Sequence, residues 1–402
     1  MLHGKKMSRD IENALILQIF QNIIDEESDN YSENDSDFES IAEDNDLITF
    51  SLLKLSEQRY LNPRIYNIPK SSYWYNEILP SYNDKHFKKI LRMTSESFKT
   101  LVQLISSHDI FKSNSERKQA PVELQLAIFL HRIGSRSDIF NICSKFGIGE
   151  GTVILYTKRI IEAIIAQKNL FVQWPKGEKR NHVYRGFQLI GGFENIISAV
   201  DGTHIILNEK PSISPELYFN RKKCYSIHCQ GIVDFQGIFI NYDIGWPGSV
   251  HDAKVYKNSS FYKKKDELII DDDFLLGDSA YPISPFCITP FRLSSNLQEK
   301  KFNIMHSSHR VVVENAFGRL KSRFTYLKGC FVKKLKHLIL FTDCAIILHN
   351  FLELNGERWE LNLDDEEEED NIIDESNNNN SDNMLKLEGQ QKRNNMMRKY
   401  VL

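Results

Sequence analysis

The spacing of hydrophobic residues divides the chain into two kinds of segment. Between residues 81 and 180, apolar positions recur every three or four residues, as in HFKKILRMTSESFKTLVQLISSH (86–108), and this spacing predicts helices. After about residue 190 the apolar residues gather in short runs typical of strands. We therefore expect an all-α domain over 81–180, followed by a different, strand-containing domain over 181–355.

One stretch of the helical block has the pattern of a helix-turn-helix. SRSDIFNICSKFGIGEGTVILYTKRIIEAI (135–164) predicts a helix capped near Ser137, a turn around 147–151 and a second helix through Ile165. A second helix of this kind can enter a DNA major groove. Its exposed face would carry Thr152, Tyr156, Lys158 and Arg159. The alternative is a plain helical hairpin that packs on its neighbours.

The domain over 181–355 alternates strands and helices. IISAVDGTHIIL (196–207) predicts a strand, and YSIHCQGIVDFQGIFINYDIG (225–245) predicts a hairpin that turns at Gln236–Gly237. A helix is expected from about 250, another strand in DDFLLGDSAYP (272–282), and a long helix around SSHRVVVENAFGRLKSRFTYL (307–327). This order of elements indicates an α/β fold.

Three carboxylates occupy separate elements of this domain: Asp201 on the first strand, Asp278 where the later strand ends, and Glu314 in the long helix. A lone buried carboxylate costs several kcal/mol, roughly, but carboxylates that meet at one sheet edge can hold Mg²⁺ or Mn²⁺. Two such ions would support attack of water or a 3′-hydroxyl on a phosphodiester. The residues therefore predict a metal-dependent nuclease or strand-transfer site, with Asp201, Asp278 and Glu314 as catalytic metal ligands.

Each carboxylate also has a purely structural interpretation. Asp201 could begin an Asp-Gly turn, Asp278 could cap a strand end, and Glu314 could pair with Arg310 one helical turn earlier. Asp252 is ambiguous in the same way, because its spacing from Ser249 suits a helix cap whereas its carboxylate suits a fourth metal ligand. Cys224, His228 and Cys229 lack the second ligand pair of a zinc site, which favours buried strand cysteines.

The charge of the chain is uneven. Residues 25–46 carry 11 acidic residues and 364–375 carry 9, and without these two segments the chain has a net charge of +17. An excess of this size predicts a polyanionic partner, namely DNA. Beyond Glu314, the long helix continues with basic residues that we expect to contact phosphates: Arg319, Lys321 and Arg323. A solvated basic surface with acidic tails is the alternative.

The remaining segments predict little folded structure. Residues 1–47 and 356–402 read as acidic, largely disordered tails, and 48–80 reads as a connecting arm. No apolar run approaches the ~18 residues of a membrane span, and the N-terminus lacks the pattern of a signal peptide. Six cysteines without a CxxC pair suit reduced thiols. We expect an intracellular protein in the nucleus or cytoplasm, without a membrane partner.

Taken together, the motifs resemble those of the DDE transposases of the PIF/Harbinger superfamily and of the nucleases derived from them. The resemblance covers roughly 85–355, and its motifs follow the order of the family: AVDGTHI, YFNRKKCYSIHCQGIVDFQGIF, GWPGSVHDAKVY, LLGDSAYP, HRVVVENAFGRLKSRF and LHNFLE. A weaker echo lies in the terminal GQQKRNNMMRKYVL. Two positions depart from the family: Cys224 where glycine is common, and His228 where asparagine is common. We do not expect either to touch the carboxylates.

This resemblance implies an RNase H-like catalytic domain with a two-metal site. Asp201, Asp278 and Glu314 would be the metal ligands, and Asp252, in the HD motif of the family, would be an additional one. Members often use a Myb-like protein for DNA binding and nuclear entry, which adds that partner to the expectations. We also count a homo-oligomer among the expected partners. A domesticated, catalytically silent DNA-binding or scaffold protein is the alternative, although the intact carboxylates argue against it.

Overall fold

The computed structural model describes residues 70–113, 118–329, 335–361 and 380–401. These residues belong to one compact unit. The predicted acidic tail over 1–47, most of the connecting arm and the acidic run at 364–375 lie outside the described residues.

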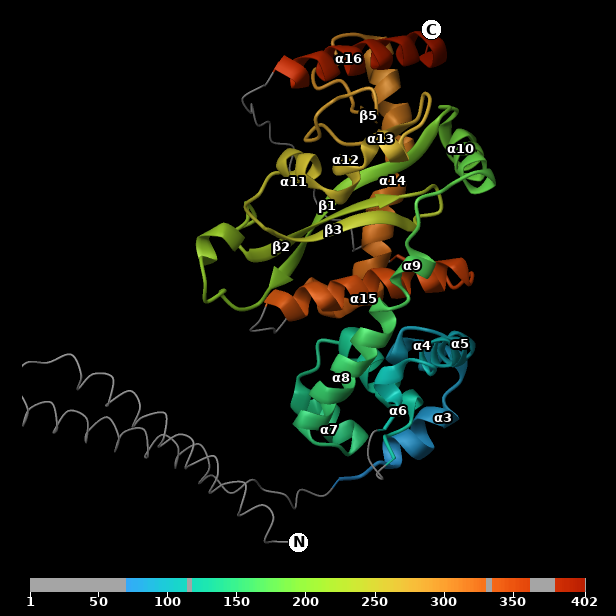
Figure 1. Ribbon diagram of the computed structural model, residues 1–402, viewed down its shortest axis with the longest axis vertical. Coiled ribbons are helices and arrows are strands. Elements are labelled where there is room, and N and C mark those ends of the chain that lie inside the picture. Colours follow the sequence, from blue (N-terminus) through green and yellow to red (C-terminus); the bar gives the residue numbers. More distant parts are fainter. Residues whose placement is uncertain (1–69, 114–117, 330–334, 362–379, 402) are drawn as a thin grey trace, which may run out of the picture. The chain divides into compact units, whose positions relative to one another are not determined.

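Among the described residues between 70 and 191, the structure is helical, in agreement with the helices that the apolar spacing predicts over 81–180. Side chains of Asn83 and Thr94 cap two of its helices by accepting a backbone N–H from the first turn. The elements are η1 (Trp74–Ile78), α3 (Leu79–Ser81), α4 (Asp84–Leu91), α5 (Ser95–Ile105), η2 (Asp109–Phe111), α6 (Val122–Ile133), α7 (Ile139–Phe146), α8 (Glu150–Ile165), α9 (Lys168–Phe171) and α10 (Glu178–Gly191) (Figure 1).

Helices α7 and α8 are separated by a tight turn. Asp138, one residue beyond the expected Ser137, caps α7 by accepting the N–H of Asn141 at 2.7 Å. Gly147 ends α7 with φ +65°, and a Cβ there would lie 2.5 Å from the backbone oxygen of Ser71. This conformation and the close approach both require glycine. Helix α8 packs against α6, α7 and α15 and ends at Ile165, as predicted.

A mixed five-stranded sheet follows, in the order β3-β2-β1-β4-β5. The central strand β1 (Ile196–Leu207) pairs antiparallel with β2 (Tyr225–Val233), which pairs antiparallel with β3 (Phe239–Pro247). On its other side β1 pairs parallel with β4 (Phe274–Leu276), and β4 pairs parallel with β5 (Cys287–Ile288). Gly237 turns the β2–β3 hairpin at φ +82°. The α/β prediction is confirmed, whereas the two-residue β5 was not predicted.

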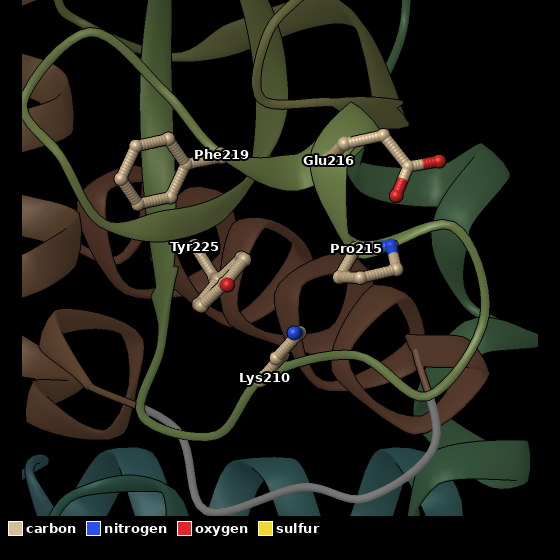
Figure 2. A pocket seen from close by; sticks show the side chains of 5 residues that line it. All are labelled: Lys210, Pro215, Glu216, Phe219 and Tyr225. Atoms are coloured by element: carbon tan, nitrogen blue, oxygen red, sulfur yellow. The ribbon is translucent and has the colours of Figure 1, made fainter.

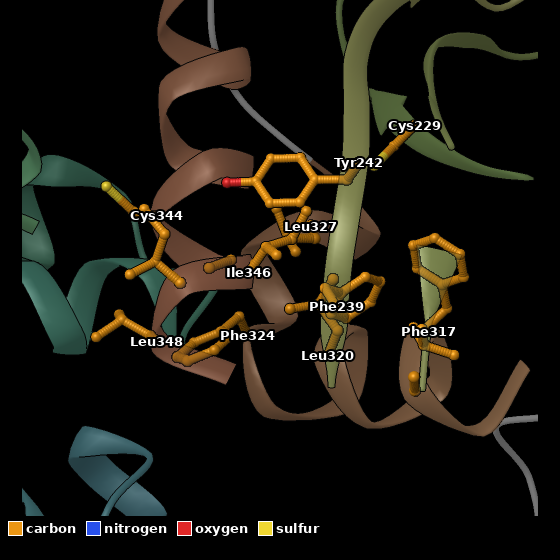
Figure 3. Packing of buried hydrophobic residues seen from close by; sticks show 14 of the residues in the cluster. Cys229, Phe239, Tyr242, Phe317, Leu320, Phe324, Leu327, Cys344, Ile346 and Leu348 are labelled. Carbon is orange, nitrogen blue, oxygen red and sulfur yellow. The ribbon is translucent and has the colours of Figure 1, made fainter. Parts of the chain in front are cut away.

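Two long helices bury one face of the sheet. Helix α14 (Leu297–Arg323) contacts β1, β2 and α10, and α15 (Leu335–Leu354) contacts β3 and α8. Phe317, Leu320 and Phe324 of α14 meet Phe239 of β3 and the apolar side of α15 in a dense core (Figure 3). By length and composition α15 could cross a membrane, but 67% of its apolar window is buried inside the protein, so it is a core helix here.

Shorter elements lie in the connections. The chain between β1 and β2 contains η3 (Pro215–Tyr218), and α14 is followed by η4 (Thr325–Lys328). Between β3 and β4 lie α11 (Asp252–Asn258), α12 (Ser260–Lys263) and α13 (Lys265–Leu268). Helix α11 contacts β2, and α12 contacts β3.

The C-terminal segment corrects one prediction. Residues 380–401 form helix α16 (Asn380–Val401) instead of continuing a disordered tail. The helix contacts α14 and β5, and a Cβ at Gly389 would lie 2.6 Å from the backbone of Ser284. Lys392 Nζ donates to the backbone oxygens of Asp272 and Pro285 at 2.9 and 2.8 Å. The tail therefore covers the edge strand β5, a contact that its polar composition does not reveal.

Candidate active site

Asp201 lies in the middle of β1, with 18% of its side chain exposed. Its Oδ1 accepts the N–H of Gly202 at 2.8 Å, and Arg310 Nη1 lies 3.5 Å from its Oδ2. Burial raises the pKa of Asp201 well above its usual value, Arg310 opposes the shift, and the charges of Asp278 and Asp252 add to it. The three aspartates are therefore close enough to influence one another. Asp201 continues the strand, so the Asp-Gly turn alternative is wrong.

The register of the parallel strands sets Asp278 beside Asp201. Ala199 of β1 pairs with Leu276 of β4, and each aspartate lies two residues beyond this pair. Asp278 Oδ1 accepts the N–H of Ala280 at 2.9 Å, which tightens the turn after β4. The capping role proposed as the structural alternative is thus present, and it leaves the carboxylate near Asp201.

Glu314 joins this pair through Arg310. Both residues belong to α14, one turn apart, and the Arg310 Nη2 atom forms an ion pair with Glu314 Oε1. The same guanidinium reaches Asp201, so Arg310 links the carboxylates of β1 and α14. Arg310 is buried, with 7% of its side chain exposed, whereas 36% of the Glu314 side chain is exposed. The predicted Arg310 pair of Glu314 is observed.

Asp252 approaches β1 from the other face of the sheet. Asp201 pairs with Gly231, where a Cβ would meet Phe317 of α14, so both positions face α14. The next residue, Gly202, faces away, and a Cβ there would lie 2.2 Å from Asp252 Oδ1. Asp252 begins α11 without a side-chain cap, so the Ser249 capping interpretation is not what the structure shows.

His228 holds the carboxylate of Asp252 next to Gly202. Its Nε2 lies 2.6 Å from Asp252 Oδ1, and its ring packs edge-on against His204, with centroids 5.4 Å apart. The expectation that His228 does not touch the carboxylates is therefore wrong, because strand β2 turns this side chain toward α11. Burial opposes ionisation of Asp252, but the hydrogen bond and charge of His228 outweigh burial and lower the pKa of Asp252.

The carboxylates have suitable chemistry for a divalent metal but are not arranged as a finished cage. Within the described residues, no three His, Cys, Asp or Glu side chains surround one point as metal ligands. The donor set is all carboxylate oxygen, which suits Mg²⁺ or Mn²⁺. Burial is the main cause of the raised pKa of Asp201, and the charges of Asp278 and Asp252 add to it. Arg310 supplies the positive charge in this conformation. The donor chemistry therefore suits a hard divalent cation, although the described residues do not form a metal site in this conformation.

The basic residues beyond Glu314 do not form the predicted phosphate surface. Arg319, Lys321 and Arg323 are 3%, 5% and 0% exposed. Arg319 Nε lies 3.4 Å from Glu353 Oε1, and Arg323 donates to the backbone oxygen of Glu357 and stacks on Trp359. The segment after α15 returns over this end of α14, which the helical spacing could not reveal. The prediction that these three residues contact DNA is wrong for this conformation.

The helix-turn-helix residues have a different environment. Lys158 is exposed and Arg159 is partly buried on α8, and Thr152 and Tyr156 are partly buried. The apolar side of α8, with Val153, Ile160 and Ile164, faces the core. A cation at position 158 is therefore accessible to a partner.

Comparison with known proteins identifies the domain that carries these residues. Residues 200–350 match the DDE superfamily endonuclease family, and Asp201, Asp252, Asp278 and Glu314 all lie within the match. No solved structure matches the chain significantly.

Several curated proteins are similar over most of the chain. The Arabidopsis thaliana protein "Antagonist of like heterochromatin protein 1" is 28% identical over 297 residues, covering 68% of this chain and 74% of its own. "Protein ALP1-like" from the same plant is 27% identical over 295 residues, covering 68% and 71%. The human "Putative nuclease HARBI1" is 25% identical over 289 residues, covering 70% and 81%.

Proposed function

We propose that the chain is a divalent-metal-dependent DNA endonuclease, because residues 200–350 match the DDE superfamily endonuclease family and the chain is similar to the human "Putative nuclease HARBI1". The observation that carries this proposal is the grouping of Asp201 on β1, Asp278 just after the paired strand β4, and Glu314 of α14 through the shared Arg310. The proposed reaction is cleavage of a phosphodiester bond, with or without strand transfer.

The topology of the sheet supports an RNase H-like domain. An antiparallel unit β1-β2-β3 is extended by parallel β4 and β5, and α14 crosses the face that Asp201 occupies (Figure 1). In this arrangement two carboxylates come from adjacent strands and the third comes from a helix. In the proposed function the three carboxylates would hold the cations that contact the scissile phosphate.

Each side chain of the site has a role in the proposed reaction. Asp201, Asp278 and Glu314 would hold two Mg²⁺ or Mn²⁺ ions, with Asp252 as an additional ligand. The ions would activate the attacking water or 3′-hydroxyl and stabilise the leaving oxygen. Arg310 would keep the buried carboxylates paired before DNA and metal bind, and His228 would position Asp252.

Cleavage of supercoiled and linear DNA tests the assigned site. We expect wild type to cut in Mg²⁺ or Mn²⁺, and Asp278→Asn to lose at least most of this activity. Asp272→Asn is the matched control, because Asp272 is an exposed aspartate shortly before β4. Equal cutting by wild type and Asp278→Asn would refute the site. Loss of cutting by Asp272→Asn as well would show that the region, and not the carboxylate, is sensitive.

Metal binding can be measured without activity. A ligand that binds only the folded protein raises its melting temperature. We expect Mn²⁺ to stabilise wild type, Arg310→Gln to increase that shift because the competing guanidinium is gone, and Asp201→Asn to abolish it. A shift that is unchanged in Asp201→Asn would place the metal elsewhere.

A catalytically silent DNA-binding or scaffold protein is the second candidate. It is favoured by one observation: Arg310 lies between Asp201 and Glu314, where it neutralises the carboxylates without a metal. This candidate predicts no metal-dependent cleavage and no Mn²⁺ shift in wild type, with DNA binding retained.

For DNA recognition we propose that α7 and α8 act as a helix-turn-helix and that the protein works in the nucleus. A Myb-like DNA-binding partner and a homo-oligomer remain part of this proposal. We expect Lys158→Ala with Arg159→Ala to weaken DNA binding and to reduce its salt dependence. The pair Lys263→Ala with Lys264→Ala, exposed lysines near α12, is the control. Identical binding by both double variants and wild type would leave α7 and α8 as a structural hairpin.

A further inference from the structure

The connection between β1 and β2, residues 208–224, has surface features that the proposed carboxylate site does not use. Its exposed large apolar side chains are Ile213, Leu217 and Phe219, at 79%, 48% and 45% exposure. Such a concentration on one connection is unusual for a surface that meets only water. The connection also carries four basic and two acidic residues.

An aromatic pair opens a pocket at this connection. The rings of Phe219 and Tyr225 meet edge to face with centroids 5.4 Å apart. They line an open pocket of about 380 Å³ together with Lys210, Pro215 and Glu216 (Figure 2). The pocket therefore combines aromatic surface with an exposed ammonium group.

Positive charge follows the aromatic residue directly. Arg221, Lys222 and Lys223 come immediately after Phe219 and buried Asn220, and all three are exposed. A nucleic acid strand carries one phosphate per nucleotide. Consecutive cations can therefore contact neighbouring phosphates while a base of the same strand stacks on the exposed ring.

The connection contacts the loop that immediately precedes Asp252. Ser249 N–H donates to the backbone oxygen of Leu217 at 3.1 Å, and Arg221 Nη2 lies 3.2 Å from His251 Nε2. His251 immediately precedes Asp252. Asn220 Nδ2 donates to Ser226 Oγ at 2.9 Å, and His204 Nδ1 lies 3.0 Å from the same oxygen. These contacts hold the connection in a defined place next to the carboxylate site.

We propose that the β1–β2 connection binds an unpaired DNA strand that flanks the cleavage position. Phe219 stacks one unpaired base while Tyr225 packs against the Phe219 ring, and Lys222 and Lys223 contact the adjacent phosphates. The inference rests on the proposed DNA-cleaving function for the identity of the strand. Duplex bases are already stacked on each other, so an exposed ring next to consecutive cations favours a single strand over a duplex.

DNA binding by the full chain tests this assignment. The measurement is fluorescence anisotropy in EDTA, so that no cleavage occurs, with a labelled duplex that carries a short thymidine overhang and with the same duplex made blunt. Wild type is expected to bind the overhang duplex more tightly. Equal affinity of wild type for the two probes overturns the proposal.

Two kinds of variant locate the binding surface. Phe219→Ala should weaken binding of the overhang duplex by roughly 5- to 100-fold, as expected for one lost stacking ring, and leave the blunt duplex unchanged. Phe219→Tyr keeps an aromatic ring and should bind like wild type. Unchanged binding of the blunt duplex by Phe219→Ala excludes misfolding as the cause of its weaker overhang binding. Tyr73→Ala is the control, because it removes an exposed aromatic ring just before η1. It should leave the affinity for both duplexes unchanged. Unchanged overhang binding by Phe219→Ala overturns the proposal.

The salt dependence tests the cations. Lys222→Gln with Lys223→Gln should lower the slope of log affinity against log salt by about 1.4, because each single-strand phosphate contact contributes about 0.7. Lys263→Gln with Lys264→Gln removes the same charge elsewhere and should leave the slope unchanged. An equal decrease in both pairs indicates general electrostatic attraction and overturns the assignment.

These outcomes are separate from those of the cleavage assay. A protein that never cuts DNA but shows the Phe219 and lysine effects loses the nuclease function and keeps this binding site. A protein that cuts in Mn²⁺ but binds overhang and blunt duplexes equally keeps its nuclease function and loses this inference.

Discussion

His228 Nε2 lies 2.6 Å from Asp252 Oδ1, on the face of β1 opposite to Asp201. The site is therefore built from both sides of one strand. Asp201 meets Arg310 and α14 on one side, and Asp252 is held by a histidine of β2 on the other.

Replacing His228 should expose how much Asp252 depends on it. His228→Ala leaves the partly exposed carboxylate of Asp252 without its hydrogen-bond donor and removes a buried ring. We expect the free energy of unfolding to fall by about 1–3 kcal/mol. His228→Asn should lose less, because the amide N–H can donate in place of the ring. Urea denaturation measures both, and equal stability of His228→Ala and wild type would contradict the structural role.

Gly202 is needed for close approach across β1. A Cβ at this position would lie 2.2 Å from Asp252 Oδ1 and 2.4 Å from His228 Nε2, so Gly202→Ala must displace the pair. We expect the free energy of unfolding to fall by roughly 1–3 kcal/mol. We also expect the variant to lose DNA cleavage. Gly151→Ala in α8 is the control, because nothing lies within 4 Å of its Cβ position. That variant should gain up to about 1 kcal/mol.

The β2–β3 turn predicts a pH effect on stability. Burial raises the pKa of Asp234 to about 6, although its Oδ1 accepts the N–H groups of Gln236 and Ile238 at 2.9 and 3.0 Å. Between pH of about 4 and 6 the folded protein keeps a proton that the unfolded chain has released, so this group makes wild type less stable as the pH rises.

Asp234→Asn should remove this contribution. Its amide oxygen can accept the same two N–H groups without a charge, so the variant should be more stable than wild type at pH 7, by up to about 3 kcal/mol. At pH 4 the difference should be small. Urea unfolding at both pH values measures this, and a gain that is equal at pH 4 and pH 7 would rule out the proton-linked explanation.

Arg323 should behave as a structural residue and not as a DNA contact. It is fully buried, donates to the backbone oxygen of Glu357 and has its guanidinium 5.2 Å from the Trp359 ring centre. Arg323→Met should lower stability by roughly 1–3 kcal/mol, because the carbonyl of Glu357 loses its donor. DNA-binding assays should find the salt dependence unchanged, whereas a slope reduced by about 0.9 would restore the predicted phosphate contact.

The sequence by itself determined the periodic elements and the family. IISAVDGTHIIL is β1 from end to end, the hairpin turns at Gly237, and the long helix contains Glu314, because apolar periodicity and glycine punctuation are local properties. The ordered set of motifs also indicated the Harbinger-type relationship that the comparisons show.

Only the tertiary structure decided what lies against each side chain. It turned His228 onto Asp252, placed α16 over β5, and brought the segment around Trp359 over Arg323. These contacts join residues that are distant in the chain. Hydrophobic periodicity is a local property, so it does not predict which distant segment packs on a given polar surface.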